Sequence, residues 1–309
     1  YNVLIALVPA LLVSFYYFGL GSVVVCSVSV AACVFFEWAI TRYMLRRPTT
    51  LLDGSACITG LLLGMNLPSN FPIWMIIIGA LVAIGIGKMT FGGLGCNPFN
   101  PAIVGRCFLL VSFPAAMTSW PVAGQQMAYT DAVTGATPLS LMKTAIKTGD
   151  VSVLQGLPDT VDMLLGNVAN GYGAGTIGEV CALALIAGLI WMLWRRVITW
   201  HIPVTILATV FVLSGALHAA NPVYAHPMAV VLSGGLMLGA IFMATDYVTS
   251  PMTHRGQVIY AVGIGVLTVV IRNWGSYPEG MSFAILIMNA FTPLINFYVK
   301  PKRFGEVSR

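Results

Sequence analysis

The sequence has very little charge. Only 8% of its 309 residues are Asp, Glu, Lys or Arg, whereas 58% are hydrophobic; soluble domains average about 25% charged residues. This composition excludes an ordinary soluble globule, and a net charge of only +5 argues against nucleic-acid binding. Long apolar runs follow one another, and about 20 such residues cross a bilayer as a helix. We therefore predict an integral membrane protein.

Cysteine and histidine motifs are also missing. The six cysteines form no CxxC pair and most lie within apolar runs, which favours small buried thiols over a disulfide or metal framework. The four histidines have no metal-ligand spacing, so no metal site is predicted. The chain starts at Tyr1 without Met; we expect preceding residues in the full protein, and the absence of a signal sequence is uninformative.

Hydropathy and helix breakers divide the chain into apolar segments. There are ten, at residues 2–18, 20–42, 54–66, 71–87, 100–113, 176–194, 201–219, 227–245, 256–271 and 281–299. We expect an all-α fold with about ten transmembrane helices. The segments 54–66 and 100–113 give only about 20 Å of helix, so we expect broken, half-membrane helices there. Such elements are tolerated only inside protein or beside a cavity.

Each half of the chain holds five of these segments. An odd number per repeat predicts two inverted five-helix repeats, a transporter-like plan with a site near the membrane midplane. Residues 59–64 echo residues 234–239, although chance similarity of Gly/Leu-rich text also explains this. The expected parts are a first repeat (1–113), a loop (114–175), a second repeat (176–299) and a tail (300–309).

The basic residues predict an orientation. With the N-terminus inside, 11 of the 15 Lys and Arg residues fall on the cytoplasmic side, and deleting any one segment destroys this asymmetry. They are Arg42, Arg46, Arg47, Lys88, Arg195, Arg196, Arg255, Lys300, Lys302, Arg303 and Arg309. Lys143, Lys147 and Arg272 remain outside, and Arg106 lies within a segment. Both termini are therefore expected to be cytoplasmic, with loop 114–175 outside.

Loop 114–175 carries a short helix signal. Thr137 precedes Pro138 and an amphipathic run to Lys147, stopped by Gly149; this predicts Thr137 as the N-cap and Pro138 as the first helical residue. A helix N-terminus also stabilises an anion, so a phosphate attached to Thr137 would be well placed. The spacing alone leaves the plain cap and the phosphate site both open.

The residues around this cap resemble a known motif. Asp131-x-x-Thr134-Gly135-Ala136-Thr137 looks like the flavin-attachment motif in which a transferase joins FMN by a phosphoester to the last Thr. Further similarity lies at residues 91–102, 118–120, 201–203, 245–246, 276–280 and 293–296. The chain thus resembles the RnfD family, the D subunits of Rnf electron-transport complexes, over nearly its whole length. The related NqrB family of the sodium-pumping NADH:quinone reductase shares the motif and fold, and the compact length favours the Rnf branch.

The resemblance implies a role in a larger enzyme. It implies a subunit, not active alone, of a translocase that couples electron transfer between ferredoxin and NAD to movement of sodium ions or protons. It places the chain in the bacterial cytoplasmic membrane, with covalent FMN outside on Thr137, beside the motif residues Gly135, Ala136 and Pro138. A second, non-covalent flavin, riboflavin, is also implied, as are the partner proteins RnfG, RnfA and RnfE. The fold would resemble that of urea and ammonium transporters.

Other polar residues have two interpretations each. Asp131 and Thr134 either serve recognition by the transferase or form an ordinary Asx turn. Asn100, before Pro101, either caps segment 100–113 or, together with Asn97, lines a cavity for a second flavin or an ion.

Ionisable groups at membrane depth are candidates for ion coupling. Glu37 and Asp246 qualify, as does Arg106. Because Glu37 and Asp246 lie near the cytoplasmic interface, a hydrated surface charge is an equal alternative. For Asp246, a turn cap before Pro251 or a pair with Arg255 is a further one.

Two functions compete with the redox subunit. One is a passive solute channel with the loop as a lid, and the other is a scaffold that holds neighbouring subunits. Neither needs the sequence from Thr134 to Thr137, so this motif favours the redox subunit.

Overall fold

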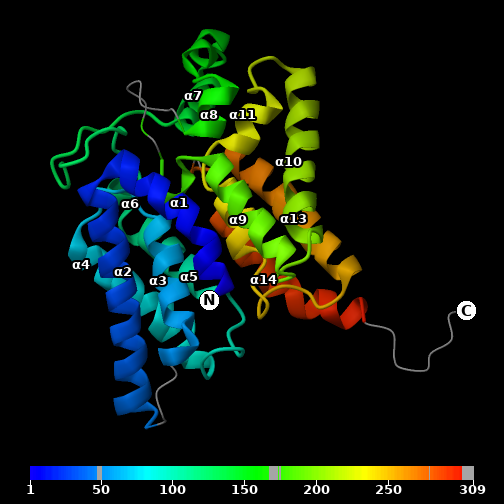
Figure 1. Ribbon diagram of the computed structural model, residues 1–309. Helices are drawn as coiled ribbons and strands as arrows, with labels where there is room; N and C mark the ends of the chain where they lie inside the picture. Colours follow the sequence, from blue (N-terminus) through cyan, green and yellow to red (C-terminus); the bar gives the residue numbers. More distant parts are fainter. Residues whose placement is uncertain (47–50, 167–172, 174, 278, 301–309) are drawn as a thin grey trace, which may run out of the picture.

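The protein is a bundle of helices with one projecting loop region (Figure 1). The computed structural model describes residues 1–46, 51–166, 173, 175–277 and 279–300. Pro278, most of the tail 300–309 and the basic residues Arg47, Lys302, Arg303 and Arg309 therefore lie outside the described residues.

Helices cover all the predicted apolar segments. The first half contains α1 (Asn2–Phe18), α2 (Leu20–Ala39) with η1 (Ile40–Met44), η2 (Leu51–Asp53), α3 (Ser55–Met65), α4 (Ile73–Leu81) with η3 (Val82–Ile86), η4 (Met89–Phe91) and α5 (Pro101–Ser112). The loop contains α6 (Pro114–Met117), α7 (Pro138–Thr148), η5 (Val151–Gly156) and α8 (Thr160–Leu165). The second half contains η6 (Ile177–Glu179), α9 (Ala182–Trp194), α10 (His201–Ala220), α11 (Pro227–Leu232), α12 (Leu236–Leu238), η7 (Gly239–Met243), α13 (His254–Trp274) and α14 (Met281–Tyr298).

Five of these helical stretches are long and apolar enough to cross a membrane. They are Leu20–Met44, Ile73–Phe91, His201–Ala220, His254–Trp274 and Met281–Tyr298. The apolar helices α1, α3, α5 and α9 are shorter. The prediction of an all-α membrane protein is confirmed, whereas the ten crossings and the inverted repeat stay predictions.

The short segments behave as their length suggests. Helices α3 and α5 have 11 and 12 residues, which is roughly 17 to 18 Å of helix. Segment 227–245, predicted as one continuous stretch, is instead interrupted: α11 ends at Leu232, and Gly234 has a φ of +65°. Glycine adopts this conformation without a Cβ penalty. The break leaves carbonyl groups inside the protein that need partners.

The two halves pack side by side (Figure 1). Helix α1 contacts α9, and α5 contacts α14; α2 packs on α3 and α4, and α10 packs on α11 and α13. Small residues allow close approach between membrane helices. A Cβ added at Gly60 of α3 would lie 2.6 Å from Val30 Cα of α2. In Figure 1, α7 and α8 stand apart from this bundle at the top of the view.

The exposure of several cysteines and basic residues differs from what the sequence predicts. All six cysteines are free; Cys26, Cys33, Cys107 and Cys181 are buried, as predicted for most of them, but Cys96 is exposed. Among the basic residues, Lys88, Lys143 and Arg272 are buried instead of lying in hydrated loops. The asymmetry that predicts orientation therefore rests on the remaining ones.

Candidate functional site

Thr137 caps helix α7 from inside the protein. Its Oγ1 accepts a hydrogen bond from the Ser140 amide at 3.2 Å, Pro138 follows as the first helical residue, and Gly149 ends the helix with a φ of +72°. The predicted cap is confirmed. Thr137 is only 7% exposed, so its hydroxyl does not lie on the outer surface of the loop.

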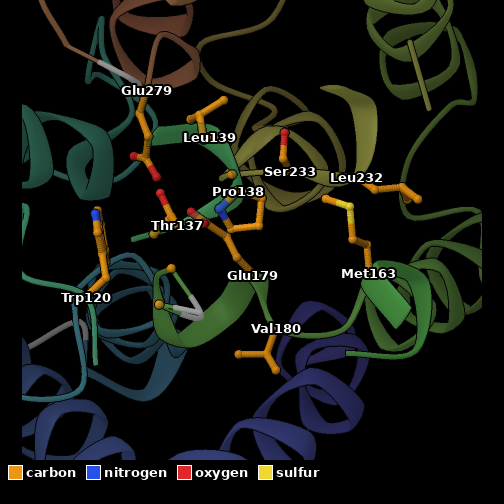
Figure 2. A pocket seen from close by; sticks show the side chains of 13 residues that line it. Trp120, Thr137, Pro138, Leu139, Met163, Glu179, Val180, Leu232, Ser233 and Glu279 are labelled. Atoms are coloured by element: carbon orange, nitrogen blue, oxygen red, sulfur yellow. The ribbon is translucent and has the colours of Figure 1, made fainter. Parts of the chain in front are cut away.

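A small pocket adjoins Thr137 (Figure 2). Its cavity of about 40 Å³ has room for a few water molecules or one small anionic group. The labelled carboxylates of Glu179 and Glu279 both point toward Thr137, while Trp120 and Met163 supply walls. The full lining is Trp120, Thr137, Pro138, Leu139, Met163, Gly173, Gly175, Glu179, Val180, Leu232, Ser233, Gly234 and Glu279.

The rest of the motif holds the loop in place. The Gly135 amide donates to the Trp120 carbonyl at 2.9 Å, and the Ala136 carbonyl accepts from the Gly173 amide at 3.0 Å. Asp131 and Thr134 lie exposed on the loop, away from the pocket lining. The structure thus brings Thr137 and Pro138 to the pocket and leaves the start of the motif at the surface.

Lys143 fastens α7 to the connection between α13 and α14. Its Nζ donates to the carbonyls of Gly275 at 2.6 Å and Tyr277 at 2.7 Å. Burial, followed by the nearby Lys147 charge, lowers the pKa of the Lys143 ammonium. The anchored segment leads directly to Glu279 of the pocket, so Lys143 fixes the position of Thr137 relative to that carboxylate.

Replacing Lys143 with Met should loosen α7. Hydrogen bonds to a charged donor contribute about 1.5–3 kcal/mol, and the substitution leaves two carbonyls without their donor. We expect amide hydrogen exchange in residues 138–148 to accelerate on the order of tenfold or more. Lys147→Met, one turn away at an exposed position, is the matched control; equal exchange rates in the two variants would contradict the anchoring role.

Arg106 is buried and joins the two halves of the chain. It is 2% exposed, and its Nη1 donates to Asn66 Oδ1 at 2.8 Å and to Ser282 Oγ at 2.7 Å. Its Nη2 forms an ion pair with Glu279. Both Nη atoms of the ionisable group noted inside segment 100–113 thus have partners, which come from both halves of the chain.

Arg272 supports the break in the second half. It is 4% exposed, and its Nη atoms donate to the carbonyls of Val230 at 2.7 Å and Ser233 at 2.8 Å. Because these carbonyls lie at the C-terminal end of α11, the guanidinium both satisfies them and opposes the negative end of the helix dipole.

A second, larger cavity lies away from Thr137. Its volume is about 370 Å³, within the range of ligand pockets, and residues from both halves line it. It is lined by Val3, Asp53, Ser55, Ile58, Thr59, Leu62, Lys88, Leu94, Asn97, Asn100, Pro101, Met192, Val197, Ile198, Phe242, Thr245, Asp246, Tyr247 and Val248. Three candidates that the sequence treated separately, Asn97, Asn100 and Asp246, therefore meet at one cavity.

Asn100 has both of its suggested roles. Its Oδ1 accepts from the Ala102 amide at 3.0 Å, which caps α5, and its Nδ2 donates to the Met243 carbonyl at 3.1 Å. The side chain also lines the cavity. Asn97 donates to the Phe99 carbonyl at 2.9 Å.

Glu37 is not a hydrated surface charge. It is 0% exposed, and Lys88 Nζ lies 2.6 Å from its Oε2. Lys88 also donates to Ser55 Oγ at 2.6 Å and lines the cavity. Glu37 is thus linked to the cavity through its ion pair with Lys88.

Asp246 lies at the cavity wall just after η7. Its Oδ2 accepts from Thr249 Oγ1 at 3.3 Å and its carbonyl accepts from the Ser250 amide at 3.0 Å, as expected for a turn cap. Among the described residues no ion pair joins it to Arg255. Burial raises the pKa of the Asp246 carboxyl, which two hydrogen bonds partly oppose.

Sequence reasoning missed Glu179, Glu279, Arg272 and Lys143. The available signal was rarity: the chain has only ten acidic residues, and Glu179 stands near the start of apolar segment 176–194, while Glu279 stands just before segment 281–299. A charge that is kept at the edge of an apolar stretch often has a buried partner. Which partner it has depends on contacts between distant parts of the chain.

The fold and the two cavities define a multi-pass α-helical membrane protein with a buried, helix-capping threonine. The family described as NQR2, RnfD, RnfE matches residues 1–305, and the chain belongs to this family. The predicted resemblance to RnfD is confirmed.

Relatives match nearly the full chain. It is 45% identical over 304 residues to the D subunit of the Na(+)-translocating ferredoxin:NAD(+) oxidoreductase complex of Acetobacterium woodii, covering 98% of this chain and 89% of the relative. It is 40% identical over 312 residues to the D subunit of the proton-translocating ferredoxin:NAD(+) oxidoreductase complex of Clostridium ljungdahlii, covering 99% and 90%. It is 37% identical over 332 residues to the D subunit of the ion-translocating oxidoreductase complex of Stutzerimonas stutzeri, covering 100% and 92%.

Proposed function

We propose that this chain is the RnfD component of an ion-translocating ferredoxin:NAD oxidoreductase and carries FMN through a phosphoester on Thr137. The observation that carries the proposal is the position of Thr137: a helix-capping hydroxyl, buried beside a pocket, at the end of the motif Asp131–Thr137. Family membership and the names of the relatives support the complex to which it would belong.

The residues present fit a phosphate at this point. Pro138 has no N–H and the Ser140 amide bonds to Thr137 Oγ1, so the Leu139 amide is the first-turn donor without a helical partner; the positive end of the helix dipole also favours an anion. Trp120, Met163 and Leu232 add apolar walls beside it. When bound, FMN supplies electron transfer, and Thr137 acts as its tether. The exposure of Asp131 and Thr134 suits recognition of the loop by a flavin transferase.

The larger cavity is the proposed place for a second ligand. Its volume of about 370 Å³ and the amides of Asn97 and Asn100 suit a non-covalent flavin such as riboflavin, or a hydrated cation on its way through the protein. Asp246 and the Glu37–Lys88 pair would then supply the charges that respond to such a cation.

Asp246→Asn should uncouple ion movement from electron transfer. The amide keeps the size and most hydrogen bonding of the carboxyl but cannot hold a cation by charge. In proteoliposomes we expect fewer sodium ions or protons moved per electron, with flavin content unchanged. Asp159→Asn, which preserves an N-cap at an exposed position, is the control; wild-type ion-to-electron ratios in both variants would exclude a coupling role for Asp246.

The orientation is part of the proposal: loop 114–175 outside, both termini in the cytoplasm, and electron exchange with an FMN of RnfG beside the membrane proteins RnfA and RnfE. Met127, 89% exposed on the loop, is the site to test. Met127→Cys should react with an impermeant maleimide in intact cells, whereas native Cys96, exposed before α5, should react only after lysis. The reverse pattern would overturn the topology.

A further inference from the structure

Glu179 lines the Thr137 pocket, and its carboxylate and the guanidinium of Arg106 both approach Gly235. Its Oε2 accepts from the Thr176 amide at 3.4 Å, whereas its Oε1 is buried and has no hydrogen-bond partner within the described part of the chain. A Cβ added at Gly235 would lie 3.0 Å from this Oε1 and 3.2 Å from Arg106 Nη1. The Glu179 carboxylate and the Arg106 guanidinium therefore face the same stretch of backbone. The Oε1 atom of Glu179 remains without a hydrogen-bond donor among the described residues.

Glu179 is shared between two cations. It interacts electrostatically with both Arg106 and Arg272. Arg106 already has Glu279 as its direct ion pair, while Arg272 donates to backbone carbonyls. The Nε atoms of both arginines are also buried without a partner in the described residues. The charges of the two arginines and the two glutamates thus balance. Arg106, Arg272 and Glu179 each keep one buried polar atom without a hydrogen-bond partner among the described residues.

Apolar residues surround part of the Glu179–Arg106–Arg272–Glu279 cluster. The turn that carries Glu179 packs through Gly178 on Met65 of α3 and Leu238 of α12, so these faces are apolar. The ionisable groups around the cluster are Arg106 and Cys107 from α5, Arg272 from α13 and Glu279 before α14.

We propose that Glu179 takes up the proton that accompanies reduction of the cofactor carried by Thr137. This inference rests on the proposed covalent FMN. With flavin bound, an electron from a one-electron carrier of the complex would add one negative charge to it. One hydronium ion from bulk solvent would give its proton to Glu179 Oε1 and leave as water, which would turn the carboxylate into a carboxylic acid. The net charge of the pocket then stays constant.

Glu179 suits this role better than Glu279. Negative charge that arrives nearby favours the protonated form of a carboxyl. Glu279 already forms the direct ion pair with Arg106, whereas Glu179 has no direct ion pair among the described residues and keeps a buried Oε1 that no hydrogen-bond donor there satisfies. In this role Glu179 compensates the charge of the reduced flavin by taking up a proton, and it does not bind the flavin ring.

The test uses the purified complex with its flavin attached. In a redox titration across neutral pH, the equilibrium constant for adding the first electron should fall tenfold for each unit that the pH rises. The midpoint potential of this one-electron couple should therefore fall by ~59 mV per pH unit. The infrared difference spectrum between the reduced and oxidised states should contain a new carboxylic-acid C=O band. Glu179→Gln should lose both signals, while Glu279→Gln, in the same pocket, should keep both.

Each outcome decides the matter. Persistence of the pH dependence and of the band in Glu179→Gln would overturn the inference, as would a pH-independent first electron in the wild type. If Glu179→Gln does not assemble, Glu179→Asp replaces it: a shifted band frequency supports the assignment, and an unchanged one assigns the band to another group. A wild-type chain without covalent flavin would instead refute the proposed function itself.

Discussion

Thr137→Val should abolish covalent flavin completely. Valine keeps the shape of threonine but removes the oxygen that would form the phosphoester. The substitution also removes the hydrogen bond from the Ser140 amide, which costs about 1 kcal/mol, too little to prevent insertion of the chain. The denatured variant on a gel should therefore show no flavin fluorescence under ultraviolet light while its amount in the membrane stays close to that of the wild type.

Thr134→Val is the matched control for this substitution. Thr134 is exposed on the same loop, and its backbone forms an isolated bridge with Pro121. This variant should keep the fluorescence. Fluorescence that persists in Thr137→Val, or that disappears only in Thr134→Val, would sink the assignment of the attachment residue.

Arg106→Met should destabilise the folded protein strongly. It leaves the partly buried Glu279 without its cation, and it removes the donor to Asn66 and Ser282. Breaking a buried ion pair by removing one partner costs about 3–5 kcal/mol. We expect a large decrease in the thermal unfolding midpoint of the detergent-solubilised protein.

Two further variants test whether the lost stability comes from the unpaired charge of Glu279 and from the buried position of Arg106. Arg106→Met combined with Glu279→Gln should recover part of the lost stability, because no unpaired charge remains. Arg255→Met removes an exposed arginine and should change stability by no more than about 0.5 kcal/mol. If Arg106→Met matched Arg255→Met, the buried cluster would not support the fold.

The sequence predicts the helices well because a membrane imposes a simple rule on them. Long apolar stretches must be helical to satisfy their backbone groups in lipid, so hydropathy locates elements such as α1, α10 and α14 to within a few residues. The Thr137 cap is equally local: a hydroxyl, a proline and a terminal glycine specify both ends of α7. Hydropathy does not predict the break at Gly234, because a Gly-rich apolar sequence has the same hydropathy whether its helix is continuous or interrupted.

Charge pairing is the part that local patterns do not predict. Lys88 counts as a loop charge in the sequence, yet it pairs with Glu37, 51 positions earlier in the chain. Arg106 and Glu279 are 173 positions apart. Such pairs depend on how the two halves dock, and their chemistry is the same as that of surface charges. For the same reason the sequence marks Asn97, Asn100 and Asp246 as candidates but does not show that they share a cavity.

The central claim is the phosphoester between FMN and Thr137, and fragmentation mass spectrometry of the native chain tests it most directly. The chain should be purified from cells that contain a flavin transferase, and the peptide that spans Thr134 and Thr137 should be sequenced in the spectrometer. Our account predicts one FMN phosphoester on this peptide, with fragment masses that place it on Thr137. An unmodified peptide from such cells, or an FMN on any other residue, would contradict it.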